Sequence, residues 1–322
     1  MKAVMDVIRR HQRFVISSHV NPEGDALGSA LALAALLKRL GKQALVTTDG
    51  GIPPAFEFFP RLARVVGRYS PSLKAEVAMT VDVPVLSRLG CMGKLFERTP
   101  LTVNIDHHVS NQRFADVNWV DPKAAAVGEM IYRLYRAFGL RPHRQEALCL
   151  YVSIVTDTGS FRYMSTTPEV HRIAAELIAQ GVSPLKVAQD LYECHQPKDL
   201  RFLGAVLQNL KSLPDGKAVW LEIPRAQFQS FRPGPEIVDE LVNYPRSIQT
   251  AEVAFVLKQK SNDGKIRISF RSKGKVDVNL LARQFGGGGH RAASGCTVEG
   301  TFPQVRGKVL DAVRKAIASS RS

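Results

Sequence analysis

The sequence of 322 residues predicts an α/β protein with two domains. An N-terminal domain built on a mainly parallel sheet is expected over residues 1–193, because short apolar runs alternate with helix-like segments there. A helical linker is expected over residues 194–216. A smaller α+β domain is expected over residues 217–322, where strand patterns are mixed with helix patterns.

Four buried strands are expected in the N-terminal domain, at residues 13–17, 44–48, 76–81 and 101–105. A helix is expected over residues 26–39 and ends before Gly41. From residue 127 to residue 193 the apolar residues recur at helical spacing, which predicts helices punctuated by Gly139, Gly159 and Gly181.

The linker is expected to be a helix over residues 197–211, with Pro197 in its first turn, where the missing N–H costs nothing. In the C-terminal domain, strands are expected at residues 218–222, 251–259, 265–271 and 295–298. Helices are expected at residues 276–284 and from Phe302 onwards.

The composition is that of an ordinary globular protein, with 45% hydrophobic and 23% charged residues. The longest apolar stretch, residues 30–37, is too short to span a bilayer, and the first residues lack the apolar core of a signal peptide. The four cysteines are scattered without a C-x-x-C pair, which favours reduced thiols. We therefore expect a cytoplasmic protein with no membrane partner.

The net charge is +15, and +9 of it falls in residues 217–322. A basic surface attracts polyanions and speeds their encounter with the protein. A solvated positive face without a specific partner is the simpler alternative, so charge alone does not establish nucleic-acid binding.

Acidic and histidine side chains follow the predicted strands at the points where the strands end. Ligands bind at this edge of open parallel sheets, so we expect the side chains to lie close together. An isolated Asp after a strand is usually a helix cap, but a histidine doublet behind an Asp is seldom accidental. The candidates are His19, Glu23, Asp25, Asp82, Asp106, His107, His108 and Asp157.

These residue types suit a site for two divalent cations. Carboxylates neutralise and bridge the cations, and imidazoles favour manganese and similar ions over magnesium alone. Two metals about 3.5–4 Å apart can clamp the attacking and leaving oxygens of a phosphate. The pattern therefore predicts a phosphoester hydrolase.

A run of glycines, Gly286 to Gly289, precedes His290 in the C-terminal domain. Consecutive glycines let backbone N–H groups approach an anion in a nest-like concavity, although a flexible surface loop is the simpler reading. The nearby strand alternates apolar residues with Lys265, Arg267, Ser269 and Arg271, which predicts a basic face beside the glycines. Arg271 is the strongest candidate for bidentate phosphate binding.

Five motifs in chain order resemble those of the DHH phosphoesterase superfamily, and the resemblance covers nearly the whole chain. The first motif runs from His19 to Ser29, and the third is Asp106-His107-His108. The second is Asp82 with Arg88-Leu89-Gly90, and the fourth runs from Thr156 to Phe161. The run Phe270-Arg271-Ser272, together with the glycines and His290, resembles the substrate-binding DHH-associated domain.

The resemblance implies a role for each matching residue. One manganese ion would be held by His19, Glu23 and Asp82, and the other by Asp25, Asp82, His107 and Asp157, with Mg²⁺ or Co²⁺ as substitutes. His108 would face the scissile phosphate as a catalytic residue, and Asp106 would orient a neighbouring histidine. Substrate would be bound by Arg88, Arg271, Ser272, Gly287, Gly288, Gly289 and His290. The family usually has Asp at the position of Glu23, where this chain has a longer side chain.

The length and domain pairing resemble members of the family that hydrolyse short oligoribonucleotides to mononucleotides and 3′-phosphoadenosine 5′-phosphate (pAp) to AMP. Short single-stranded RNA, pAp and related nucleotides are the implied partners, and a homodimer is plausible for the family. Two alternatives stay open. One is a phosphodiesterase of the same superfamily for cyclic dinucleotides or linear pApA. The other is a nucleotide-binding protein without catalytic activity.

Overall fold

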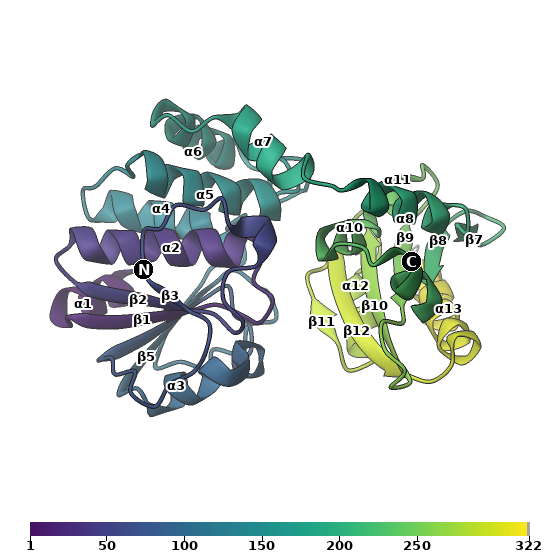
Figure 1. Ribbon diagram of the computed structural model, residues 1–322, viewed down its shortest axis with the longest axis horizontal. Helices are drawn as coiled ribbons and strands as arrows, with labels where there is room; N and C mark the ends of the chain where they lie inside the picture. The colour runs from purple at the N-terminus through teal and green to yellow at the C-terminus, as the bar shows by residue number, and fades with distance from the viewer. Residues whose placement is uncertain (321–322) are drawn as a thin grey trace. The chain divides into compact units, whose positions relative to one another are not determined.

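The computed structural model describes residues 1–320, and the chain divides into two units between Leu191 and Tyr192 (Figure 1). In this described part no helix combines the length and the apolar character needed to cross a membrane. The predicted fold class is confirmed, with a parallel sheet in the N-terminal unit and a second sheet in the C-terminal unit.

A parallel sheet of six strands forms the centre of the first unit, in the order β3-β2-β1-β4-β5-β6. The four predicted strands are confirmed. Two strands were missed because they are short and only half-buried, so their apolar pattern is weak. The strands are β1 (Arg13–Ser17), β2 (Gln43–Thr47), β3 (Val65–Val66), β4 (Val77–Val81), β5 (Leu101–Asp106) and β6 (Val117–Val120).

Helices cover this sheet, and α2 is the most deeply buried of them. Its bounds are Gly24–Arg39, and every residue from Gly24 to Leu37 is buried. It packs against the sheet on one side and against α4 and α5 on the other (Figure 1). The other helices are α1 (Lys2–Arg10), α3 (Gly93–Arg98), α4 (Val127–Ala137), α5 (Arg144–Asp157), α6 (Pro168–Ala179) and α7 (Pro184–Tyr192). Short 3₁₀ helices are η1 (Pro54–Phe56) and η2 (Leu86–Met92).

The second unit is built on a mixed sheet in the order β11-β12-β10-β9-β8-β7, in which only β8 and β9 pair in parallel. Its strands are β7 (Lys211–Ser212), β8 (Ala218–Ile223), β9 (Val253–Lys258), β10 (Lys265–Ser272), β11 (Gly288–Gly289) and β12 (Ala293–Glu299). Its helices are α8 (Pro197–Leu207), α9 (Arg225–Phe231), α10 (Pro235–Glu240), α11 (Asn243–Ser247), α12 (Val278–Arg283) and α13 (Phe302–Ser319).

Each face of this second sheet carries its own hydrophobic core. One core joins strand residues such as Phe255 and Phe270 to α12 and α13. The other lies over β8 and β9 and contains Phe202 and Val206 of α8. The segment 194–216, expected as a linker, therefore contains a helix whose apolar face is buried in the second unit. Asp199 of α8 also accepts a hydrogen bond from the Gly234 amide at 2.8 Å.

Candidate metal centre

The candidate side chains gather at the carboxyl ends of β1, β4 and β5, joined by the start of α2 and the end of α5. His19 follows β1, Asp82 follows β4, and Asp106 is the last residue of β5. Because these three strands are neighbours in the parallel sheet, their ends meet at one edge. Asp25 lies in the first turn of α2, and Asp157 is the last residue of α5.

Asp82 lies at the centre of the group. One carboxylate oxygen, Oδ2, is 3.4 Å from His19 Nε2, while Oδ1 is 3.6 Å from His107 Nε2 and 3.5 Å from His108 Nδ1. Its backbone has φ of +60°, a left-handed conformation that is uncommon outside glycine. Such outliers persist where the surroundings hold them, often at functional sites, so this backbone strain is consistent with a site that fixes the Asp82 carboxylate.

His19 is oriented by the chain that follows it. Its Nδ1 lies 2.8 Å from the carbonyl oxygen of Val20 and 3.1 Å from Nη2 of Arg88. A protonated Nδ1 can donate to the Val20 carbonyl, and this contact directs Nε2 towards Asp82. The backbone carbonyl of Arg88 also accepts a hydrogen bond from the Val20 amide at 2.7 Å. Arg88, expected as a substrate contact, thus lies beside His19.

Asp25 is fixed by donors from two other helices. Its carboxylate accepts hydrogen bonds from the amides of Val127 at 2.8 Å and Gly128 at 3.1 Å, which open α4. The hydroxyl of Ser153 on α5 donates to the same carboxylate. The positive end of the α4 dipole faces the carboxylate, which favours its ionised form. Asp25 therefore holds α2, α4 and α5 together at the site.

His107 connects Asp82 to the carboxylates supplied by the helices. Its Nε2 lies 3.3 Å from Asp157 Oδ2 and 3.8 Å from Asp25 Oδ2. Its other ring nitrogen, Nδ1, is 3.1 Å from the carbonyl oxygen of Ala124. This backbone contact fixes the ring so that Nε2 points towards the carboxylates, as in histidines that bind metals.

Asp106 is completely buried and holds His108. Its Oδ1 accepts from His108 Nδ1 at 2.8 Å, and its Oδ2 accepts from the Asn111 amide at 2.5 Å. Asn111 also donates to Asn104 Oδ1 at 2.8 Å. With Nδ1 engaged by Asp106, Nε2 is the nitrogen that His108 can present to another group.

The crowded charges shift the pKa values of these groups. Burial, together with the Asp82 and Asp157 carboxylates, raises the pKa of Asp25 to about 8. Burial lowers the pKa of His107, but the carboxylates of Asp157, Asp25 and Asp82 outweigh it and raise that pKa to about 9. Burial raises the pKa of Asp82, but the hydrogen bond from His19 and the charges of His108, His19 and His107 outweigh it, and the pKa is lowered.

The arrangement fits divalent cations. Asp82 Oδ1 is buried and has no hydrogen-bond partner among the described residues, a costly state for a carboxylate oxygen unless a cation or donor binds there. Within the first unit, two sets bring ligand atoms within 4.8 Å of one another, namely Asp25-Asp82-His107 and Asp82-Asp106-His108. Within residues 1–320, Glu23 belongs to no such set; it precedes α2 and its side chain is exposed.

Packing and turn geometry account for part of the glycine run in the second unit. The amides of Gly286 and Gly287 donate to the carbonyls of Arg283 and Ala282, so these two N–H groups are engaged within the fold. A Cβ on Gly287 would lie 2.1 Å from the Gly295 carbonyl oxygen. Gly288 and Gly289 form β11, and His290 closes the turn into β12.

The predicted alternation along β10 is present, with Ile266, Ile268 and Phe270 buried and Lys265 and Arg267 exposed. Arg271 is half-buried, and its guanidinium donates to the Phe270 carbonyl at 3.0 Å. Ser272 lies on the opposite, buried side of the strand, where its hydroxyl accepts from the Gly274 amide at 3.4 Å.

Residues that position the candidate ligands were missed in the sequence. Ser153 lies four residues before Asp157, so both project from one face of α5, and this spacing could have identified it. Asn111 follows the histidine doublet closely, but nothing in the sequence shows that it folds back onto Asp106. The residues at the start of α4 bind Asp25 through their backbone amides, so their side chains give no signal of this contact in the sequence.

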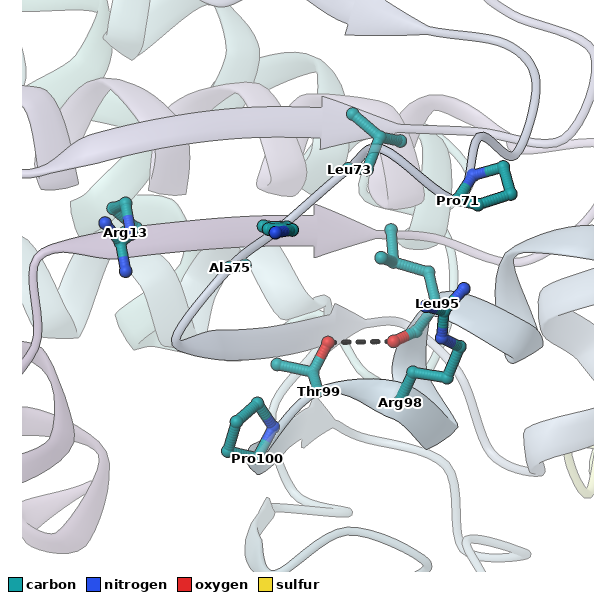
Figure 2. A pocket seen from close by; sticks show the side chains of 9 residues that line it. Arg13, Pro71, Leu73, Ala75, Leu95, Arg98, Thr99 and Pro100 are labelled. Carbon is teal, nitrogen blue, oxygen red and sulfur yellow. Dashed lines mark hydrogen bonds between the residues drawn. The ribbon is translucent and has the colours of Figure 1, made fainter.

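A separate cavity lies at the amino ends of the strands, away from the candidate ligands (Figure 2). Its volume is about 330 Å³. Arg13, the first residue of β1, lines it together with Leu95 and Arg98 of α3. Because the candidate ligands lie at the carboxyl ends of the same strands, this cavity is not part of the metal centre.

Two family models match the chain. Residues 13–154 match the N-terminal domain of the DHH family, and residues 226–319 match the DHHA1 domain. The first match contains the candidate ligands described above except Asp157, and the second contains β10 and the glycine run. The order of the two matches agrees with the order of the two units.

Three known proteins are similar to this chain along nearly their whole length. The bifunctional oligoribonuclease and PAP phosphatase NrnA of Thermus thermophilus is 32% identical over 98% of this chain and 94% of its own length. The protein of the same name from Bacillus subtilis is 29% identical, over 90% and 91% respectively. The crystal structure of an exopolyphosphatase-related protein from Bacteroides fragilis aligns with a TM-score of 0.90 and 28% identity, covering 100% of this chain and 97% of that one.

Proposed function

Because the chain belongs to the DHH family, we propose that it is a metal-dependent phosphoesterase that hydrolyses short oligoribonucleotides to mononucleotides and pAp to AMP. The observation that carries the proposal is the buried Asp82 carboxylate. Three histidines surround it, and one of its oxygens has no hydrogen-bond partner in the part of the chain that the structure describes. The relatives named as oligoribonuclease and PAP phosphatase support this choice of substrates.

In this proposal two Mn²⁺ ions are bound, with Mg²⁺ or Co²⁺ as substitutes. Asp82 is the shared ligand, His19 belongs to one ion, and Asp25, His107 and Asp157 belong to the other. Glu23, which is exposed, would have to move its side chain to contribute to the first. Bound divalent cations supply Lewis acidity, which activates water and offsets phosphate charge.

The protein's own groups supply positioning and a proton. The Asp106 carboxylate holds His108 Nδ1, so Nε2 is the atom that faces the leaving oxygen or a phosphoryl oxygen. Burial lowers the pKa of His108, but Asp106 and Asp82 outweigh it and raise that pKa, which favours the protonated, donating imidazole. Arg88, Arg271, Ser272, Gly287, Gly288, Gly289 and His290 are proposed to bind substrate.

We expect Asp106→Asn to lower kcat by about 10- to 100-fold while most of the bound metal is retained. The neutral amide no longer raises the pKa of His108, so the loss of activity at high pH should begin at a lower pH than in the unchanged protein. The pH–rate profile measures this shift. Asp116→Asn is the matched control, because its exposed carboxylate binds Thr102 at the far end of β5. An unchanged profile would remove Asp106 from this role.

Binding of Mn²⁺ is expected to strengthen as pH rises from about 6 to 9. In the metal-free site Asp25, with a pKa of about 8, and His107, with a pKa of about 9, hold protons at pH 7. A cation must displace these protons, so affinity should rise by up to about tenfold per pH unit for each proton released and level off above pH 9. Titration calorimetry in buffers of different ionisation enthalpy counts the protons. Affinity that is independent of pH would contradict this coupling.

The proposed function is tested by product release with Mn²⁺ from pAp, from di- to pentaribonucleotides, from a long single strand and from cyclic di-AMP. The same reactions in EDTA are the control. Turnover of pAp and the short RNAs supports the proposal. Turnover confined to cyclic di-AMP or pApA would assign the protein to the cyclic dinucleotide branch. Nucleotide binding without turnover of any substrate would leave a binding protein.

Three further features belong to the proposal. A cytoplasmic location follows from its RNA substrates, and cell fractionation would test it. A homodimer, which the family resemblance implies, would be tested by sedimentation. The choice of Mn²⁺ would be tested by metal analysis of protein purified without added metal.

A further inference from the structure

One face of the sheet in the second unit is covered along only part of its width. The core that contains α8 residues covers this face over β8 and β9. The opposite face is covered by α12 and α13. Over β10, the side chains that point to the first face are exposed or half-buried, and they include Arg267, Ser269 and Arg271.

The register of the strands places three rows of side chains across this face, because residues directly opposite one another share a face. The row of Arg267 contains Lys258 and Thr297, and the row of Arg271 contains Ala254 and Ala293. Between them, Ser269 lies opposite Val256 and Gly295. On β10 and β12, no side chain larger than a serine separates the two arginines, which lie about 13 Å apart along the strand.

The first row carries positive charge that is only partly neutralised. Lys258 is 6% exposed and lies directly opposite Arg267, a like-charge arrangement that costs stability. Its ammonium is 3.5 Å from the exposed Asp239 carboxylate. Among the side chains that the structure describes, Arg267 forms no ion pair. Asp239 thus offsets the charge of Lys258 alone, and an anion bound beside the two cations would offset the charge of Arg267.

A neighbouring charge links this row to Arg271. Burial lowers the pKa of Lys258, Asp239 opposes this effect, and the charges of Lys260 and Arg271 lower the pKa further. The positive field of Lys258, Arg267 and Arg271 therefore extends along the exposed strip. Basic strips of this kind follow the backbone of single-stranded nucleic acids.

We propose that Lys258 and Arg267 contact a phosphodiester of the substrate beyond the one bound near Arg271, and that this contact favours trinucleotides and longer RNAs over dinucleotides and pAp. The proposal rests on the proposed function. The two phosphates of pAp lie on one nucleoside and are too close together to reach both arginines. A trinucleotide is long enough to reach from Arg271 to Arg267. Its ribose or base would then lie over the small side chains of the row that contains Ser269 and Gly295.

The test compares Arg267→Gln with the unchanged protein on pAp, pApA and pApApA. We expect the KM for pApApA to rise about tenfold with kcat unchanged, because a charge-assisted contact is lost. The KM values for pAp and pApA should change less than twofold. A plot of log(kcat/KM) for pApApA against the logarithm of the salt concentration should have a slope smaller in magnitude by about 0.7, which is the value for one phosphate contact to a single strand. Lys258→Gln should act in the same direction, and Arg267→Lys should restore most of the affinity.

The matched control is Lys315→Gln, which removes one exposed charge from α13 on the opposite face of the sheet. An equal rise of KM for all three substrates, or no rise for any, would overturn the proposal. If the unchanged protein hydrolyses none of them, the proposed function fails separately. In that case, calorimetric titration in EDTA measures the dissociation constants of pApApA and pAp. The inference requires that pApApA binds more tightly than pAp and that Arg267→Gln abolishes this difference.

Discussion

Asp82→Asn is expected to lower kcat/KM for every substrate by about a thousandfold or more. Each oxygen of the Asp82 carboxylate has a histidine nitrogen within 3.6 Å, and Asp82 is shared by the two close ligand sets of the first unit. An amide has no charge to neutralise a cation and offers only one oxygen. In the proposed two-metal site, loss of the shared ligand would remove electrostatic stabilisation of the phosphate at the reacting centre, where single contacts are each worth about a hundred- to a thousandfold.

The substitution is chosen so that the fold survives. Asp82 adopts φ of +60°, and Asn tolerates this left-handed conformation better than Ala does. Activity, bound Mn²⁺ and circular dichroism are measured together. Asp6→Asn, at a surface ion pair with Arg9 in the same unit, is the control for loss of one charge. A variant that keeps normal activity would show that Asp82 is not a shared metal ligand.

The position of the site could be predicted because it follows from the order and direction of the strands in the first sheet. Once three apolar segments form neighbouring parallel strands, the residues that follow them must meet at one edge, and this applies to His19, Asp82 and Asp106. Asp25 could be predicted because it opens the helix after the first strand. Glu23 lies two residues before it but is exposed, since it precedes α2 and has an extended backbone.

What the sequence did not reveal depends on tertiary contacts. The amides that bind Asp25 come from the start of α4, about a hundred residues away along the chain. The glycines before His290 suggested free N–H groups, but α12 ends there and its last carbonyls use two of them. The amphipathic helix α8 was predicted, whereas the surface that covers its apolar face depends on β8, β9 and α10.

Gly28→Ala is expected to lower the free energy of unfolding of the first unit by about 2–3 kcal/mol. A Cβ on Gly28 would lie 2.4 Å from the carbonyl oxygen of Cys149 in α5. This neighbour is backbone within a helix, so it cannot rotate away as a side chain would. The helices α2 and α5 must then separate, and the loss should appear as a lower midpoint in urea unfolding.

The same substitution should also weaken Mn²⁺ binding, although Gly28 offers no ligand atom. Asp25 on α2 receives a hydrogen bond from Ser153 on α5, and Asp157 ends α5, so separation of these helices moves ligands apart. Gly93→Ala is the matched control in the same unit, because a Cβ there would be 4.0 Å from its nearest neighbour. If Gly28→Ala lowered stability but left the affinity for Mn²⁺ unchanged, the metal centre would not depend on the contact between α2 and α5. A fall in both would show that one close helix contact sets both the packing of the unit and the geometry of its ligands.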